Sequence, residues 1–112
     1  MHTYSNDQNT WNVHKLWEAA KDLPIKWEPL DKFAGVLDEC VWVEPNQPVT
    51  VREIMEHCIR IQKADLDFPI ILSASGELMD GVHRIAKAVL KGHSVIQTVR
   101  FKIDPPPLPK GV

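Results

Sequence analysis

Hydrophobic positions near the start of the chain recur about every three to four residues, which is the spacing of an amphipathic helix. The pattern predicts a helix over residues 11–21, capped by the Thr10 hydroxyl and stopped by Pro24, which cannot continue a helix. An aromatic residue in such a stripe is more typical of a packed core than of a base-stacking platform. The face that we expect to be buried consists of Val13, Leu16, Trp17 and Ala20.

The next stretch alternates between apolar and polar residues, which is typical of short strands. Residues 25–28 predict a strand that ends at Pro29, and residues 40–43 form a second candidate strand. Between them, residues 30–35 predict a turn or a single helical turn. The middle of the chain is therefore expected to be mainly strand and turn.

A second helix is predicted from Thr50 to about Ala64, because Thr50 and Glu53 have the spacing of a capping box. His57 borders the apolar stripe of this helix, where a lone histidine is more often a packing residue than a catalyst. The stripe that we expect to face the core consists of Val51, Ile54, Cys58 and Ile61.

The last third of the chain reads as strand, turn, short strand, helix and strand. Residues 68–72 are apolar and β-branched, residues 73–77 are turn formers, and Leu78-Met79 begins a second strand. A helix then runs to Gly92, which suits the left-handed position after a helix end, and residues 95–103 alternate as a final strand. In this helix we expect a buried face of Val82, Ile85, Ala86 and Val89, opposite a basic stripe of His83, Arg84, Lys87 and Lys91.

The length of 112 residues and the ordinary composition indicate one globular domain. We expect a flexible N-terminus over residues 1–9, the domain over residues 10–103 and a proline-rich tail over residues 104–112. The tail has the composition of a polyproline-II segment; it could dock onto a proline-reading groove, although an extended terminus is the simpler interpretation. The fold class that these elements predict is α+β, with a small mixed sheet packed against helices.

Charge and hydropathy exclude some partners. The net charge is −2 and no basic block is present, so duplex DNA is not an expected partner. No apolar run has membrane-spanning length and no leader pattern is visible, and Cys40 and Cys58 form no paired motif. These features predict a cytoplasmic protein with buried, reduced thiols and no membrane partner.

The most informative chemistry lies in residues 80–84, Asp-Gly-Val-His-Arg, where a strand passes directly into a helix. The first backbone N–H groups of a helix lack intrahelical partners and favour anions. Gly81 leaves room for a phosphate, and His83 and Arg84 add donors in the same turn. Asp80 is equally a good helix cap, and a capping carboxylate would occupy these donors and repel a phosphate. If a phosphate binds, Asp80 must turn aside, toward Mg²⁺ or a substrate hydroxyl.

The run from Pro69 to Phe101, with this motif at its centre, resembles the ParB/sulfiredoxin superfamily, in particular small ParB-like proteins and free-serine kinases with an Asp-Gly-x-His-Arg step. The resemblance implies a ParB/sulfiredoxin-like fold in which the matching loop and helix start hold the phosphates of a nucleotide. It also implies that the helix carrying His57 lies beside the nucleotide.

Departures from the family narrow the chemistry. Sulfiredoxins have a nucleophilic Cys where this chain has Val82, which excludes their sulfinic-acid reduction. Chromosome-partitioning ParB proteins have Gly-Glu-Arg-Arg, and the absence of that Glu puts their CTP hydrolysis in doubt. Because no helix-turn-helix domain follows residue 103, a DNA-partitioning role is not expected.

The leading hypothesis is a domain that binds a purine or cytidine tri- or diphosphate with Mg²⁺, with phosphotransfer or hydrolysis left open. Asp80 would bind the metal or accept a proton, and His83 would supply charge or a proton. The expected phosphate ligands are Gly81, Val82, His83 and Arg84, with His57 as a secondary candidate. The alternatives are a non-catalytic protein-interaction module of phage or plasmid type, and a nuclease, for which a basic track is missing. Oligomeric state stays open.

Overall fold

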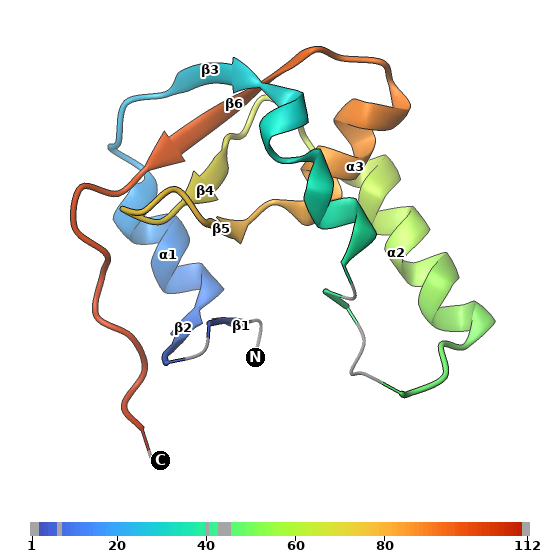
Figure 1. Ribbon diagram of the computed structural model, residues 1–112, viewed down its shortest axis with the longest axis horizontal. Helices are drawn as coiled ribbons and strands as arrows, with labels where there is room; N and C mark the ends of the chain where they lie inside the picture. Colours follow the sequence, from blue (N-terminus) through green and yellow to red (C-terminus); the bar gives the residue numbers. More distant parts are fainter. Residues whose placement is uncertain (1–2, 7, 40, 43–45, 111–112) are drawn as a thin grey trace.

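A four-stranded mixed sheet forms the centre of the molecule (Figure 1). The structure, a computed structural model, describes residues 3–6, 8–39, 41–42 and 46–110. The strand order is β3-β6-β4-β5, in which β4 and β6 run parallel while β3 pairs with β6, and β5 with β4, in antiparallel fashion. The strands are β3 (Lys26–Pro29), β4 (Ile70–Leu72), β5 (Leu78–Asp80) and β6 (Val95–Arg100). The predicted α+β class with a mixed sheet is therefore confirmed.

Helices cover the sheet, and a separate hairpin of β1 and β2 precedes them. In the described part of the chain no helix combines the length and hydropathy needed to cross a bilayer. The remaining elements are β1 (Thr3–Ser5), β2 (Thr10–Asn12), α1 (Val13–Ala20), the 3₁₀ helices η1 (Leu30–Lys32) and η2 (Ala34–Asp38), α2 (Val51–Lys63) and α3 (Val82–Leu90).

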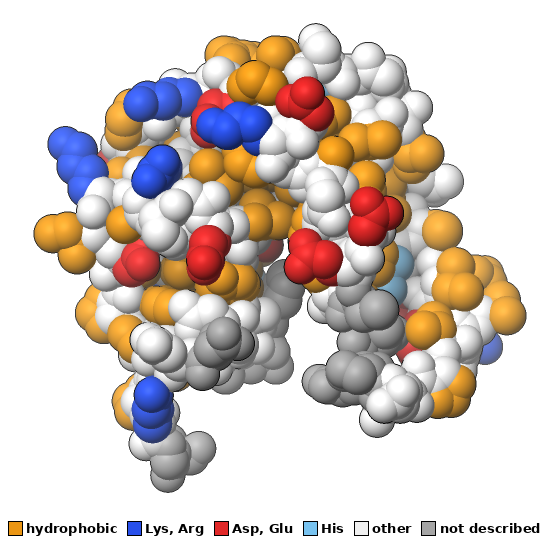
Figure 2. Space-filling view, viewed as in Figure 1, with side chains coloured by type: hydrophobic (Ala, Val, Ile, Leu, Met, Phe, Trp, Pro, Cys, Tyr) orange, Lys and Arg blue, Asp and Glu red, His pale blue; other side chains and the backbone are white. Residues whose placement is uncertain are grey.

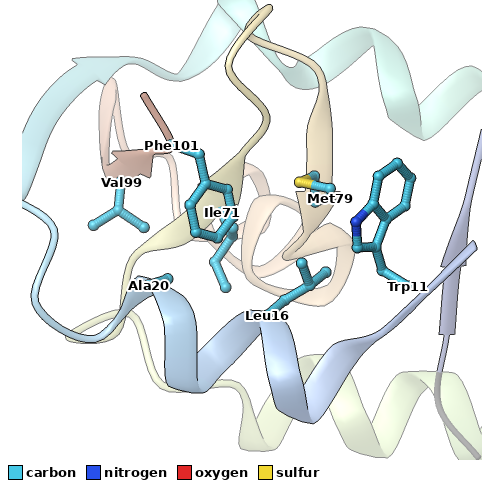
Figure 3. Close-up of a cluster of buried hydrophobic side chains, with 7 residues drawn as sticks. All are labelled: Trp11, Leu16, Ala20, Ile71, Met79, Val99 and Phe101. Carbon is cyan, nitrogen blue, oxygen red and sulfur yellow. The ribbon is translucent and has the colours of Figure 1, made fainter. Parts of the chain in front are cut away.

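Both faces of the sheet are buried. All three residues of β4 are buried, although successive side chains in a strand point to opposite faces. On one face, α1 and Trp11 of β2 close a cluster (Figure 3) that consists of Trp11, Leu16, Ala20, Ile71, Met79, Val99 and Phe101. On the other face, α3 and η1 close a second cluster that consists of Leu30, Ile70, Leu72, Ile85, Ala88 and Ile96. The domain thus has a helix layer on each side of a central sheet.

The final strand, β6, does not follow the alternation predicted for residues 95–103, because it lies inside the sheet. The strand ends at Arg100, earlier than the expected residue 103, and Ile103 is exposed. Ile96 and Thr98 are buried on one side of the strand, and Val99 is buried on the other. A strand with neighbours on both edges and helices over both faces has no solvated side, so simple alternation does not describe it.

The first helix is shorter than predicted. Thr10 belongs to β2, and the side chain of Asn12 caps α1 instead, by accepting a hydrogen bond from the Lys15 N–H. Trp17, expected in the core, is 42% exposed. Residues 1–9, expected to be a flexible terminus, contain β1, which pairs with β2.

The cap of α2 is confirmed, but its predicted core face is wrong. The Thr50 hydroxyl accepts a hydrogen bond from the Glu53 N–H at 3.1 Å. No residue of α2 is buried: Ile61 is half-buried, while Val51, Ile54 and Cys58 are exposed.

Polar bonds from α3 hold the carboxyl end of α2. The Lys87 ammonium donates to the carbonyls of Gln62 and Ala64, and the Arg84 Nε donates to the carbonyl of Asp65. These bonds satisfy carbonyls that a helix end leaves without partners. Arg84 and Lys87 of the basic stripe therefore attach α2 to α3, which leaves the apolar stripe of α2 outside. In α3 itself, Ile85, Ala86 and Ala88 are buried, whereas Val89 is exposed.

Residues 30–35 form 3₁₀ helices, in agreement with the predicted turn. The candidate strand over residues 40–43 falls partly outside the described residues, as does Cys40. Val41 and Trp42, which are described, belong to no strand.

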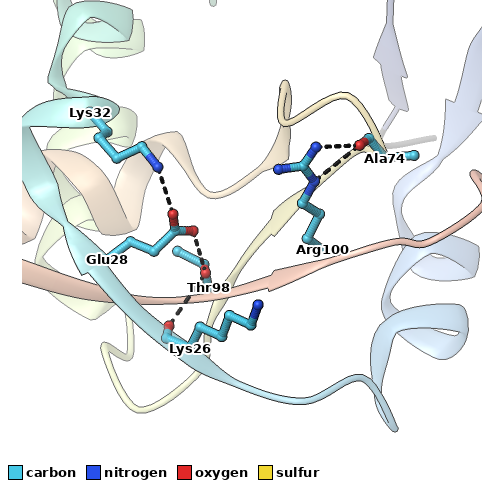
Figure 4. A network of polar contacts seen from close by, with 6 residues as sticks. All are labelled: Lys26, Glu28, Lys32, Ala74, Thr98 and Arg100. Atoms are coloured by element: carbon cyan, nitrogen blue, oxygen red, sulfur yellow. Dashed lines mark hydrogen bonds and ion pairs between the residues drawn. The ribbon is translucent and has the colours of Figure 1, made fainter.

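Buried and half-buried polar groups on the sheet are bonded to one another (Figure 4). The Thr98 hydroxyl donates to a carboxylate oxygen of Glu28 at 2.8 Å, and the Lys32 ammonium donates to the other oxygen at 2.8 Å. These hydrogen bonds hold the pKa of Glu28 below its usual value. Arg100 donates from Nε to the Ala74 carbonyl at 3.0 Å and ties the β4–β5 turn to β6.

Gly81 joins β5 to α3 in a space that admits no side chain. Its φ is +130°, and a Cβ placed there would lie 2.4 Å from Cγ2 of Ile70. Gly92 has a φ of +75° at the end of α3, as predicted from its position. The two glycines therefore bound α3, and Gly81 sets how closely the helix approaches the sheet.

We expect Gly81→Ala to lower the free energy of unfolding by about 2–5 kcal/mol, the combined cost of a strained φ and of overpacking. Urea unfolding followed by circular dichroism measures this change. Gly35→Ala is the matched control, because an added Cβ there meets nothing within 4 Å. A Gly81→Ala protein as stable as Gly35→Ala would contradict the packing described here.

Candidate functional site

The predicted motif lies where β5 passes into α3. Gly81 occupies the N-cap position of α3, and no described side chain caps the first turn. Figure 1 shows the β5–α3 junction between the α1 side and the α2 side of the molecule. The start of α3 thus has the backbone arrangement that favours an anion.

The sequence left open whether Asp80 caps α3 or leaves its first N–H groups to an anion. In the structure Asp80 does not cap α3. Its Oδ2 accepts a hydrogen bond of 2.7 Å from Nε1 of Trp17 on α1. The same oxygen lies 3.6 Å from Nη1 of Arg84. The carboxylate is therefore turned toward α1 and away from the role of a helix cap.

Arg84 is shared between two neighbours. Its Nε donates to the Asp65 carbonyl at 3.1 Å, and its Nη1 faces Asp80. The guanidinium carbon also lies 6.0 Å from the ring centroid of Phe68. Because a guanidinium has five N–H donors, these contacts leave donors for a further acceptor.

His57 and His83 form a hydrogen-bonded pair. Nδ1 of His57 and Nε2 of His83 lie 3.0 Å apart, and the two rings are inclined by 16°. Trp42 stacks on both imidazoles, with centroid distances of 4.0 Å to His57 and 4.6 Å to His83. His57 on α2, the secondary candidate for a phosphate ligand, is thus in direct contact with His83 of the motif on α3.

The pair has a defined proton chemistry. A hydrogen bond between two ring nitrogens requires a donor on one ring and an acceptor on the other, so at least one of the two bonded nitrogens is unprotonated. Burial lowers the pKa of His57, and the nearby Arg60 lowers it further, against the opposing effect of Glu56 and Glu53. The neutral form of His57 is therefore favoured, and its ring can donate or accept the hydrogen bond with His83, depending on the tautomer.

The structure joins the predicted residues into two pairs, Asp80 with Arg84 and His57 with His83. Gly81 is buried and Val82 half-buried between the pairs. In the described residues no group of three or more His, Cys, Asp or Glu side chains could hold a metal ion, so Asp80 is at most one ligand. A pocket between η1 and the α3–β6 connection is lined in part by Asp31 and His93, and none of the residues predicted for the phosphate site lines it.

Two residues of the site were missed. Trp17 was assigned to the core by its helical spacing, and Trp42 lies in the segment expected to be a strand. For Trp17 the signal was its position at the edge of the apolar face of α1, where a large ring with a polar N–H often finds a partner. For Trp42 no local signal exists, because its partners lie on α2 and α3.

Comparison with protein-family models, curated proteins and solved structures finds no match for this chain.

The lowered pKa of His57 predicts a pH-dependent stability. Because the native-state pKa lies below the unfolded-state value of ~6.5, the unfolded chain binds the proton more readily. The stability that depends on neutral His57 is fully present above about pH 6.5 and is lost as the pH falls toward the native-state pKa. We expect the thermal midpoint of the wild type to fall over this range by more than that of His57→Gln.

Differential scanning fluorimetry at a series of pH values measures this difference. His93→Gln, which removes an exposed histidine outside the site, serves as the control and should follow the wild type. If the midpoints of the wild type and of His57→Gln change with pH in parallel, His57 does not contribute to the pH dependence of stability.

Proposed function

We propose that this chain binds the phosphates of a nucleoside tri- or diphosphate at the start of α3, in a domain of ParB/sulfiredoxin-like fold. The observation that carries the proposal is the state of Asp80. Asp80, which stands one residue before the N-cap Gly81, is bonded to Trp17, and no described side chain caps the first turn. Asp80 therefore does not compete with an external anion for the backbone donors at the start of α3.

The energies favour moderate affinity. A charge-assisted hydrogen bond from Arg84 to a phosphate contributes about 1.5–3 kcal/mol, and a helix terminus adds at most ~2 kcal/mol. Binding in the micromolar range follows when a base or sugar adds further contacts. Trp42, which is part-exposed beside His83, offers an aromatic surface on which a base can stack.

Magnesium enters this proposal with the nucleotide. Oδ2 of Asp80 is engaged by Trp17, whereas Oδ1 takes no hydrogen bond from a described residue. Mg²⁺ commonly binds through one or two carboxylates together with substrate phosphates, which suits a site with a single carboxylate. The metal would also offset the repulsion between Asp80 and a phosphate.

The proposal extends to phosphotransfer or hydrolysis. Asp80 would hold the metal or accept the proton of an attacking hydroxyl, as the carboxylates of phosphotransferases do. His83, which shares a proton with His57, would stabilise charge that develops on the phosphate. Binding without turnover would leave the same residues as a nucleotide-responsive switch.

We expect isothermal titration calorimetry with ATP, ADP, CTP and GTP in the presence of Mg²⁺ to detect binding of at least one nucleotide. Arg84→Ala should weaken that binding about tenfold to hundredfold, the equivalent of one charge-assisted hydrogen bond. The absence of heat with all four nucleotides would reject the proposal.

The matched control is Arg52→Ala, because Arg52 is an exposed arginine at the opposite end of α2 from Asp65. It should bind nucleotide as the wild type does. Thermal midpoints of both variants separate a lost phosphate contact from a general loss of fold, since Arg84 also bonds the Asp65 carbonyl.

A second candidate function, a protein-interaction module, is favoured by the apolar stripe of α2. Its side chains are exposed, to 73% for Val51, and Figure 2 shows hydrophobic side chains gathered along the α2 edge of the molecule. Exposed apolar surface of this kind marks contact sites. The exposed apolar residues of α2 are Val51, Ile54, Met55, Cys58 and Ile59.

The charges beside this stripe favour a second copy of the chain. Glu53 and Glu56 lie in the first half of α2, and Arg60 and Lys63 lie in the last turn. An antiparallel pair of α2 helices would bring opposite charges together across a twofold axis. It would also oppose the two helix dipoles.

For this second candidate we expect the mass measured by light scattering to rise toward a dimer with concentration, under reducing conditions that prevent a Cys58 disulfide. Met55→Glu should keep the chain monomeric by placing a charge in the contact. Leu90→Glu changes an apolar residue on α3 that is even more exposed than Met55, and this variant should dimerise normally. A wild type that stays monomeric at every concentration would exclude the pairing.

A further inference from the structure

The C-terminal tail is bound to the body of the domain. Nε1 of Trp11 donates to the Pro105 carbonyl at 2.8 Å, and the Leu108 N–H donates to the Thr10 carbonyl at 2.6 Å. In Figure 1 the tail leaves β6 and passes beside α1 toward β2. Residues 105–108 therefore lie along the hairpin that β1 and β2 form.

Contact residues in the tail have the spacing of polyproline II. Pro105 and Leu108 are half-buried, whereas Pro106, Pro107 and Pro109 are exposed. A polyproline-II helix has about three residues per turn, so residues separated by three lie on one side. The tail thus presents a Pro-x-x-Leu face to the domain and leaves its other prolines in solvent.

Two aromatic rings lie together in the hairpin that the tail follows. Tyr4 of β1 and Trp11 of β2 lie with ring centroids 5.7 Å apart. Trp11 belongs to the first core cluster (Figure 3), and its Nε1 also donates the hydrogen bond to the tail. An aromatic groove with a donor for a main-chain carbonyl is the usual means of holding a polyproline-II segment.

The start of the tail is fixed as well. Oδ1 of Asp104 accepts a hydrogen bond of 2.8 Å from the Ala74 N–H in the β4–β5 turn. Burial raises the pKa of Tyr4, and the charges of Glu77 and Asp104 raise it further, as expected for a carboxylate near the phenol. Asp104 therefore aligns the segment before it reaches Trp11.

We propose that Tyr4, Thr10 and Trp11 form a binding site for proline-rich segments of other proteins with Pro-x-x-Leu spacing, which the tail of this chain occupies. The tail supplies the chemistry of the expected ligand, because its own contacts use this spacing. A tethered segment competes at an effective concentration in the millimolar range. A foreign segment must therefore displace the tail before it binds. This inference is independent of the nucleotide proposal, since it involves none of residues 80–84.

The test uses full-length protein and a fluorescent peptide with the sequence of residues 103–110, followed by anisotropy. Leu108→Asp in the protein removes one of the two half-buried tail contacts and opens the groove. We expect this variant to bind the wild-type peptide about tenfold more tightly than the wild-type protein does, because the competing tail is weakened. The same peptide with Leu108→Asp should bind neither protein.

A second variant tests the donor itself. Trp11→Phe, combined with Leu108→Asp, keeps a ring in the core but removes the N–H that bonds the tail carbonyl. Its affinity for the wild-type peptide should fall about threefold to tenfold, the equivalent of one hydrogen bond, while circular dichroism reports an unchanged fold.

Two outcomes would overturn the proposal. The first is equal binding, or no binding, of the wild-type peptide to the wild-type and Leu108→Asp proteins. The second is a concentration-dependent dimer of the wild type that Leu108→Asp lacks, which would assign the groove to the tail of a second copy.

Discussion

The contact between Gly81 and Ile70 determines how the rest of the candidate site is arranged. Ile70 is fully buried in the cluster beneath α3, so it cannot retreat from a side chain at residue 81. Because glycine has no Cβ, α3 begins directly against β4, with its first turn at the edge of the sheet. This position sends Asp80 toward α1 and presents His83 and Arg84 to the α2 side. A single backbone approach thus places all the polar groups of the motif.

The orientation of Asp80 follows from the same junction. Gly81 occupies the N-cap position, which leaves Asp80 one residue too early to cap the helix. Its carboxylate accepts a hydrogen bond from the indole N–H of Trp17 instead. The motif predicted the competition between cap and anion site, but its outcome depended on a tryptophan 63 residues away in the sequence.

Features set by neighbouring residues could be predicted from the sequence, and features set by distant packing could not. The Thr50 cap, the left-handed Gly92 and the strand–turn–strand–helix order around residues 70–90 depend on local backbone chemistry. The exposure of the α2 stripe depends on which residues of α3 face it, and these are polar. Likewise Trp42 reaches the site only because η2 and α2 bring its loop beside the histidine pair. Helical periodicity finds an apolar face but does not say whether another element covers it.

Arg84 attaches α2 in this structure, and its geometry would allow it to bind the proposed phosphate at the same time. Nε is directed to the Asp65 carbonyl beyond α2, and Nη1 is directed to Asp80 at the start of α3. A phosphate on the first turn of α3 would draw on the Nη donors, which Asp80 contacts only at 3.6 Å, and would leave the Nε bond in place. Lys87 keeps the carbonyls of Gln62 and Ala64 satisfied in either state. The attachment of α2 and the binding of an anion therefore use different atoms of the same side chain, and neither requires the loss of the other.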